Sequence, residues 1–292
     1  MRVTSSGSYD TLLSGIQSIE QRLQQDQLEI TTQNKINQPS DNPSGAADLV
    51  RLTGEKSEIA QYKSNAAAGQ DRLSYSDTVL GNVQDLIQRV ISLGQTALGN
   101  TSMASAYTTE IDGLRDQIVS AANTNFQGVS IFGGTVTDKS PYVVQSDGSV
   151  TYQGNSSAIQ VQVGRATTLQ MGIPGSQVFS GAIDVFSTVK QLSAAITAGD
   201  KSAMQTQLTN LQQYFDSVSA SRTQVGSLVN QAQSVQSDLQ TYELARATDQ
   251  SRIQSADLAQ ATTDFTQTQT ALQAAMAVGA RISQISLLDY LR

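Results

Sequence analysis

Residues 37–43 of the chain read Asn-Gln-Pro-Ser-Asp-Asn-Pro, and this stretch divides the N-terminal half into two helices. Two prolines so close together cannot lie inside one continuous helix, because proline lacks a backbone N–H and its ring clashes with the preceding turn. Asn42 is a favourable N-cap residue, and proline is favoured at the first helical position that follows it. We therefore expect one helix to fill the first forty residues as far as Asn37, and a second helix to begin at Pro43.

The first of these helices carries a narrow apolar seam, and a similar seam lies near the C-terminus. Apolar residues recur at spacings of three and four, as in a coiled coil, with Asp26 interrupting the N-terminal series. An isolated pair of such helices, rich in Ala and Gln, would be marginal in water. Self-assembly is therefore favoured over an ordinary core. The candidate self-assembly and partner-binding residues are Leu12, Ile16, Ile19, Leu23, Ile30, Leu258, Phe265, Leu272, Ile282, Ile285, Leu287, Leu288 and Tyr290.

Downstream of Pro43 the helical period continues to Gly99, and a further helix is expected from Ser102 to about Asn123. Between residues 128 and 176 the period changes to two and the glycines become dense, which predicts short strands and tight turns. The helical period then returns for the rest of the chain. The polar stretch 245–252 is expected to separate the last helix from the helices before it.

These patterns predict a mainly α protein, in which both chain ends form a long coiled-coil helical bundle with a small inserted β domain. The expected domains are an N-terminal assembly helix, the N-terminal half of a helical bundle, the β insert, the C-terminal half of the bundle and a C-terminal assembly helix. Their expected ranges are 1–42, 43–127, 128–176, 177–250 and 251–292.

The composition argues against most other classes of protein. The formal net charge is −7 without a basic cluster, so nucleic-acid binding is not expected. The chain has no Cys and no His, which removes disulfides, thiol nucleophiles and zinc sites with N or S ligands. We expect no catalytic, cofactor or metal site, and neither a cleaved signal peptide nor a membrane span.

The sequence disfavours two rival classes of protein. The glycine-rich segment 131–135 lacks the Lys-Ser/Thr of a phosphate loop, and pairs such as Asp112 with Asp116 are typical of solvated helix faces, so an enzyme is disfavoured. A coiled-coil signalling or adhesion module would need a membrane segment or a receptor-binding insert, and the sequence offers neither.

Several segments together resemble the flagellin family. They are Asn37-Gln-Pro-Ser-Asp-Asn-Pro-Ser-Gly-Ala46, Asn125-Phe-Gln-Gly-Val-Ser-Ile-Phe-Gly-Gly134, Tyr152–Asn155, Arg222–Gly226, Ser251–Leu258 and Ser286–Leu291. Filament flagellins usually carry a Gln-Ala-Asn…Pro-Gln run before their final leucines, whereas residues 275–282 here contain no proline. That departure favours the branch of the family that joins the hook to the filament, with a flagellin filament subunit as the alternative.

The resemblance implies a structural adaptor that assembles through its terminal coiled-coil helices after type III export. It implies a ring of copies between hook-associated protein 1 and flagellin, and a cytoplasmic export chaperone that holds the C-terminal helix. It also implies an extracellular place in the bacterial flagellum, reached without a cleaved signal peptide.

Overall fold

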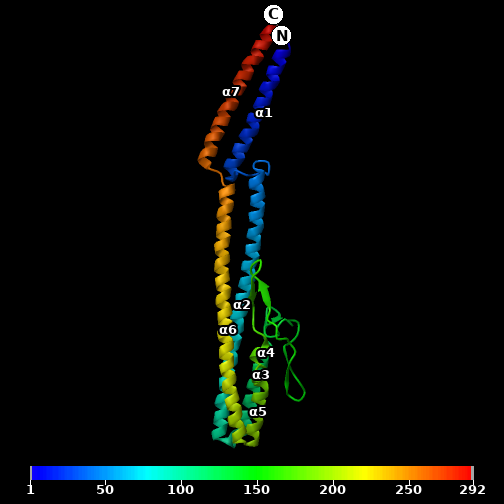
Figure 1. The fold of residues 1–292 in the computed structure, drawn as a ribbon, viewed down its shortest axis with the longest axis vertical. Helices are drawn as coiled ribbons and strands as arrows, with labels where there is room; N and C mark the ends of the chain where they lie inside the picture. The colour runs from blue at the N-terminus through cyan, green and yellow to red at the C-terminus, as the bar shows by residue number, and fades with distance from the viewer. Residues whose placement is uncertain (1, 291–292) are drawn as a thin grey trace. The chain divides into compact units, whose positions relative to one another are not determined.

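The computed structural model describes the backbone of residues 2–290, and their side chains except those of residues 2–6, 8, 9, 101 and 282–290. Helices dominate, which confirms the expected mainly α fold with a small β insert (Figure 1). The helices are α1 (Arg2–Thr32), α2 (Pro43–Gly99), η1 (Thr101–Met103), α3 (Ala104–Ala122), α4 (Gly175–Val178), α5 (Val185–Ala198), α6 (Lys201–Gln254) and α7 (Leu258–Tyr290). The strands are β1 (Asn125–Phe126), β2 (Val129–Ser130), β3 (Tyr142–Val144), β4 (Val150–Tyr152), β5 (Gln160–Gln162) and β6 (Thr168–Gln170).

The chain divides into two compact units. The terminal unit combines Met1–Glu58 with Glu243–Arg292, and the central unit is Ile59–Tyr242. The start of α2 and the end of α6 belong to the terminal unit, and the rest of both helices belongs to the central unit. The domain ranges expected from the sequence differ from this division, and they stay predictions.

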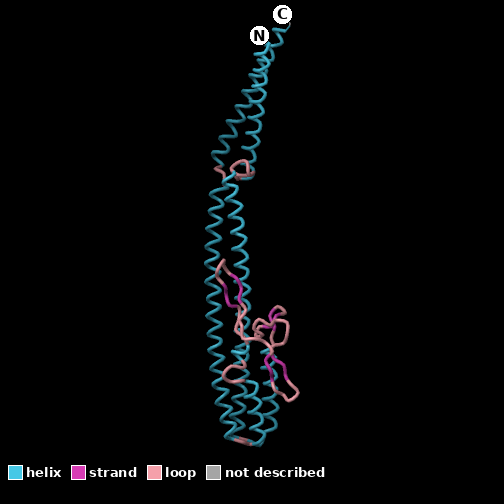
Figure 2. The backbone as a smooth tube through the Cα atoms, turned by 45° about the vertical axis from the view of Figure 1, so that its right-hand side comes forward, coloured by secondary structure: helices cyan, strands magenta, loops and turns pink. Residues whose placement is uncertain are grey.

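The core of the central unit lies where α2, α3, α5 and α6 pack side by side (Figure 2). Apolar side chains at spacings of three and four give each helix one buried stripe. Among the fully buried members are Leu80, Ile87 and Val90 of α2, Ile111 and Ile118 of α3, Val189 and Leu192 of α5, and Leu211, Val218 and Val225 of α6. This continuous core stabilises the unit.

Local signals fix the ends of α5. The Asp184 carboxylate accepts a hydrogen bond from the backbone N–H of Ser187 at 2.7 Å and so caps the first turn. Gly199 then takes a left-handed conformation, with φ of 69°, and its N–H bonds back to the last turn. Gly199 and Asp200 therefore separate α5 from α6.

The strands form three separate antiparallel hairpins in the described chain, β1–β2, β3–β4 and β5–β6. Asp147-Gly148 turns the β3–β4 hairpin: Gly148 has φ of 73°, and the Asp147 carboxylate accepts from the Ser149 N–H at 2.9 Å. Aromatic rings fasten the insert to the helices, because Tyr142 of β3 lies within 5.5 Å of both Phe179 and Phe186, measured between ring centroids.

Two boundaries predicted from the sequence are wrong. Helix α1 ends at Thr32 rather than at Asn37, because Gln33 takes a left-handed conformation, with φ of 60°, that ends the helix. The polar stretch 245–252 does not separate two helices, since α6 continues through it to Gln254. That stretch is polar but contains neither glycine nor proline, so nothing in it breaks a helix.

Candidate assembly interface

Helices α1 and α7 lie side by side in the terminal unit (Figure 1). They run antiparallel: Thr268 Oγ donates to the Asp26 carboxylate at 2.8 Å, and further along Leu12 lies opposite Gly279. A Cβ on Gly279 would come within 3.0 Å of Leu12 Cδ2, so the glycine permits the close approach of the two helices. The pair brings together the two seams that were identified from the sequence.

Pairing covers the N-terminal seam only in part. All five candidates on α1 are half-buried, in contrast to the fully buried stripes of the central unit; they are Leu12, Ile16, Ile19, Leu23 and Ile30. A two-helix pair can cover one side of each apolar residue, and the other side stays accessible. The seam therefore retains apolar surface that a further helix could cover.

The C-terminal candidates are placed less uniformly. Phe265 and Leu272 are half-buried, while Leu258 at the start of α7 is 43% exposed. The remaining candidates lie outside the residues whose side chains are described; they are Ile282, Ile285, Leu287, Leu288 and Tyr290. Their part in assembly stays a prediction.

Sequence reasoning missed Thr268, which is 8% exposed and is the residue that reaches across to Asp26. Its position was signalled by spacing, since Ala261, Phe265, Thr268 and Leu272 follow one another at intervals of four, three and four. Asp26 interrupts the apolar series in the sequence, but in the structure it supplies the acceptor for the polar contact within the seam. A polar pair inside an apolar seam fixes the register of two helices.

The face of the pair around Asp26 is acidic. A groove there is lined by Ile19, Arg22, Asp26, Asp264, Gln267, Thr268 and Ala271. Nearby, the pKa of Glu29 is raised above its usual value, first by burial and then by the charges of Asp26 and Asp264. Lys35 acts in the opposite direction but does not cancel the rise.

A short two-part junction links α1 and α7 to the neighbouring ends of α2 and α6. The Lys35 N–H donates to the Gln254 carbonyl at 2.8 Å, and the Ala256 N–H donates to the Gln33 carbonyl at 2.9 Å. These bonds fasten the segment after α1 to the segment before α7. Backbone N–H and C=O groups that lose their helical partners where α1 and α6 end are thereby hydrogen-bonded to each other.

The Pro39–Pro43 segment is organised by its own side chains. The Asp41 carboxylate accepts from the N–H groups of Asn37 and Gln38, at 2.9 and 2.8 Å. Asn42 accepts from the Gly45 N–H at 2.9 Å, so the N-cap expected at the start of α2 is present.

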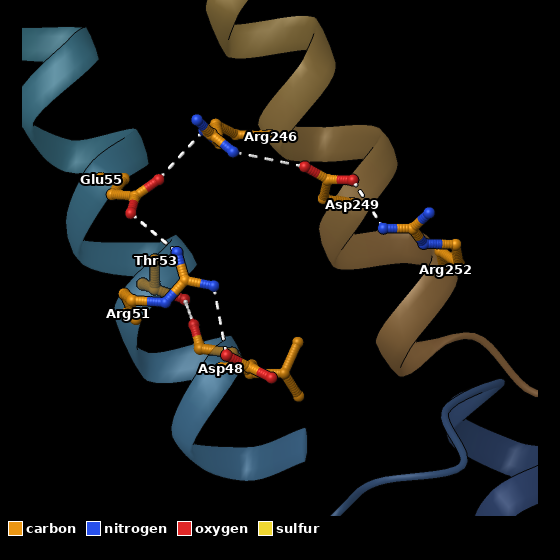
Figure 3. Close-up of polar contacts among 8 residues, drawn as sticks. Asp48, Arg51, Thr53, Glu55, Arg246, Asp249 and Arg252 are labelled. Atoms are coloured by element: carbon orange, nitrogen blue, oxygen red, sulfur yellow. Dashed lines mark hydrogen bonds and ion pairs between the residues drawn. The ribbon is translucent and has the colours of Figure 1, made fainter. Parts of the chain in front are cut away.

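A chain of ion pairs joins the ends of α2 and α6 within the terminal unit (Figure 3). Glu55 of α2 is its centre, because it contacts Arg51 at 2.8 Å on its own helix and Arg246 at 3.0 Å on α6. Arg246 continues to Asp249 at 3.4 Å. Each such exposed pair adds little stability alone, but the network sets how the two helix ends face each other.

No group of three or more acidic side chains in the described part of the chain could hold a metal ion. None of the helices described between residues 2 and 290 is long and apolar enough to cross a membrane.

Two family models match the chain. The N-terminal helical region of bacterial flagellin matches residues 3–137, and the C-terminal helical region of bacterial flagellin matches residues 208–291. The two matched ranges include all of α2 and α7, α1 except Arg2, and most of α6.

Individual relatives fall into two groups. Flagellar hook-associated protein 3 of Salmonella typhimurium is 28% identical over 185 residues, which cover 62% of this chain and 57% of that protein. The match thus spans little more than half the length of that relative. Flagellin FljM of Caulobacter vibrioides is 29% identical over 241 residues, which cover 78% of this chain and 83% of that protein.

Among solved structures, FlgL of Bacillus cereus is 25% identical with a TM-score of 0.60, and the likeness covers 69% of this chain and 99% of that one.

Proposed function

Because the chain carries both helical regions of bacterial flagellin and so belongs to the flagellin family, we propose that it is a structural subunit of the flagellum that joins the hook to the filament. The observation that supports this most directly is the half-buried seam of α1 and α7. Its apolar residues are arranged for helix packing, and one helix pair covers them incompletely. The role is mechanical and requires no chemistry.

Assembly completes the seam in the following way. Copies of the chain pack their α1–α7 pairs against one another, so that Leu12, Ile16, Ile19 and Leu23 lose their remaining contact with water. Each buried CH₂ group contributes about 0.8 kcal/mol, so a few such residues per copy add up to stable association. Docking then further stabilises the terminal helices, which in the single chain are held only by half-buried seams.

The partners follow from this role. The copies form a ring with hook-associated protein 1 on one side and flagellin on the other. Before export a cytoplasmic chaperone holds the C-terminal helix and prevents its seam from associating too early. The protein reaches the extracellular flagellum through the type III apparatus without a cleaved signal peptide.

Electron microscopy of a strain that lacks this protein tests the proposal. We expect intact hooks without filaments, together with flagellin released into the medium, and restoration of filaments by the full-length gene. Filaments on the hooks of the deletion strain would overturn the proposal. Loss of the hooks themselves would also overturn it, because a junction subunit acts after the hook is complete.

A filament subunit is the second candidate. The match with FljM favours this role, because it covers 83% of FljM, whereas the match with hook-associated protein 3 covers 57% of that protein. The two roles differ in self-assembly. A filament subunit would polymerise alone into long filaments when purified protein is concentrated. A junction subunit would stop at short rings, which negative-stain microscopy distinguishes directly.

A further inference from the structure

Arg72 of α2 is an unusual buried charge in the central unit. The residue is 6% exposed, and its Nη2 donates to the backbone carbonyl of Ser130 at 2.7 Å. Its Nε is also buried and has no hydrogen-bond partner. A buried cation without a counter-charge is unfavourable, because it has lost the water that stabilised it in the unfolded chain.

The other two arginines of α2 are compensated in the usual way. Arg51 contacts Asp48 and Glu55, and Arg89 donates twice to Glu110, at 2.9 and 2.6 Å. For Arg72 burial lowers the pKa, and no ion pair found among the described side chains includes it. Arg72 is thus the arginine of α2 whose charge the described chain leaves unbalanced.

A small cavity lies against this side chain. It is lined by Arg72 with Ile131, Gly134, Ala158, Ile159, Gly172, Ile173 and Pro174, is partly open to solvent, and has a volume of about 10 Å³. That is room for one particle close to the size of a water molecule. The walls are otherwise apolar side chains and glycines, together with backbone groups such as the Ile131 carbonyl. A Cβ on Gly172 would lie 3.8 Å from Arg72 Nε, which places open space beside the unpartnered N–H.

We propose that this cavity binds one monoatomic anion, chloride under ordinary conditions, which accepts a hydrogen bond from Arg72 Nε. A water molecule would fill the same space but would leave the guanidinium charge unbalanced. The room beside Nε is close to that of a water molecule, so a monoatomic anion fits it. The ion neutralises Arg72 and thereby strengthens the attachment of β2 and of the segment around Gly172 to α2.

Replacement of chloride by gluconate at constant ionic strength tests the site in solution. A ligand that binds only the folded state raises the folding equilibrium constant by the factor 1 + [L]/Kd, which is about tenfold at ten times Kd. Urea unfolding followed by circular dichroism should therefore show the wild-type protein stabilised by chloride. No response of the wild type to chloride would overturn the proposal.

Three variants show where the ion binds. Gly172→Ala places a methyl group beside Nε at ordinary contact distance, so it should abolish the chloride response while Arg72 stays in place. Arg72→Gln should abolish it as well. Arg89→Gln, which removes an arginine of the same helix, should keep it. A chloride response that persists in Gly172→Ala and in Arg72→Gln would contradict the assignment.

Crystals of the wild-type protein grown in sodium bromide decide the matter even if Arg72→Gln fails to fold. We expect an anomalous scattering peak within hydrogen-bond distance of Arg72 Nε, and its loss in crystals of Gly172→Ala. A cavity that holds water, without anomalous signal, would overturn the proposal.

Discussion

Ile87 and Ile16 occupy similar places in the apolar stripes of their helices, but their burial differs. Ile87 of α2 is completely buried, whereas Ile16 of α1 is half-buried. Ile87→Ala should therefore lower the free energy of unfolding of the monomer by about 2–5 kcal/mol, the range for large-to-small changes in a packed core. Ile16→Ala should cost about 1 kcal/mol. Urea unfolding of both variants checks this, and equal losses would contradict the distinction between core and seam.

Glu29 makes the α1–α7 pair sensitive to pH. Its pKa is raised above 4.5 in the folded chain, chiefly by burial and then by Asp26 and Asp264, with a further contribution from Asp41 opposed by Lys35. The folded state therefore binds this proton more tightly than the unfolded chain does. The resulting stability is present below about pH 4.5 and is lost as the pH rises through the folded-state pKa.

Glu29→Gln removes that loss, because glutamine carries no charge at any pH. We expect the variant to melt at a higher temperature than the wild type at pH 7 and to match it at pH 4. Glu20→Gln is the control, since Glu20 is exposed on the same helix. An equal gain in both variants at pH 7, measured by thermal melting in circular dichroism, would sink the interpretation.

At the scale of helices and strands, the sequence predicted boundaries wherever a residue with a strong conformational preference stands. Pro43 begins α2 as expected, and Gly199 and Asp147-Gly148, which have similarly strong preferences, follow the end of α5 and turn a hairpin. The end of α1 was predicted poorly, because Gln33 has no intrinsic preference for the left-handed conformation that the junction imposes on it.

For the polar stretch 245–252 the sequence predicted a helix boundary where the structure has none. Its charges suggested a separator, yet Arg246 and Asp249 take part in the ion-pair chain on a continuous helix. The sequence alone does not show that Arg246 pairs with Glu55, because the two residues are far apart in the chain. For the same reason the α1 seam residues were found by their period, while the contact between Asp26 and Thr268, 242 positions apart in the sequence, was not.

The terminal helices should be the first elements that a protease removes. The junction residues Lys35 and Arg252 are exposed trypsin sites, and α1 and α7 are held by half-buried seams. Limited trypsin digestion of the purified monomer should therefore leave a stable fragment near residues 36–252, because local opening costs least where few apolar contacts must break. Mass spectrometry identifies the fragment. Terminal segments that resist digestion as long as the central unit does would show that the seams need no partner.

At the scale of the whole molecule, the two chain ends depend on each other. The terminal unit is built from Met1–Glu58 and Glu243–Arg292, so each seam has the other as its covering surface within the monomer. The central unit, Ile59–Tyr242, has its own continuous core. Damage to a seam should therefore spare the fold of the central unit and affect attachment to other subunits.

Leu23→Asp tests whether damage to the α1 seam affects attachment to other subunits and spares the central unit. Leu23 is half-buried on α1, and a carboxylate there would have to be buried without a partner when copies assemble, which is strongly unfavourable. We expect the variant to retain the urea midpoint of the central unit and to yield cells with hooks but no attached filaments. Gln24→Asp, one position along the same helix at an exposed site, should support normal filaments. Electron microscopy and swimming assays compare the two strains. Filaments attached through the Leu23→Asp protein would mean that the α1 seam is not a contact between subunits.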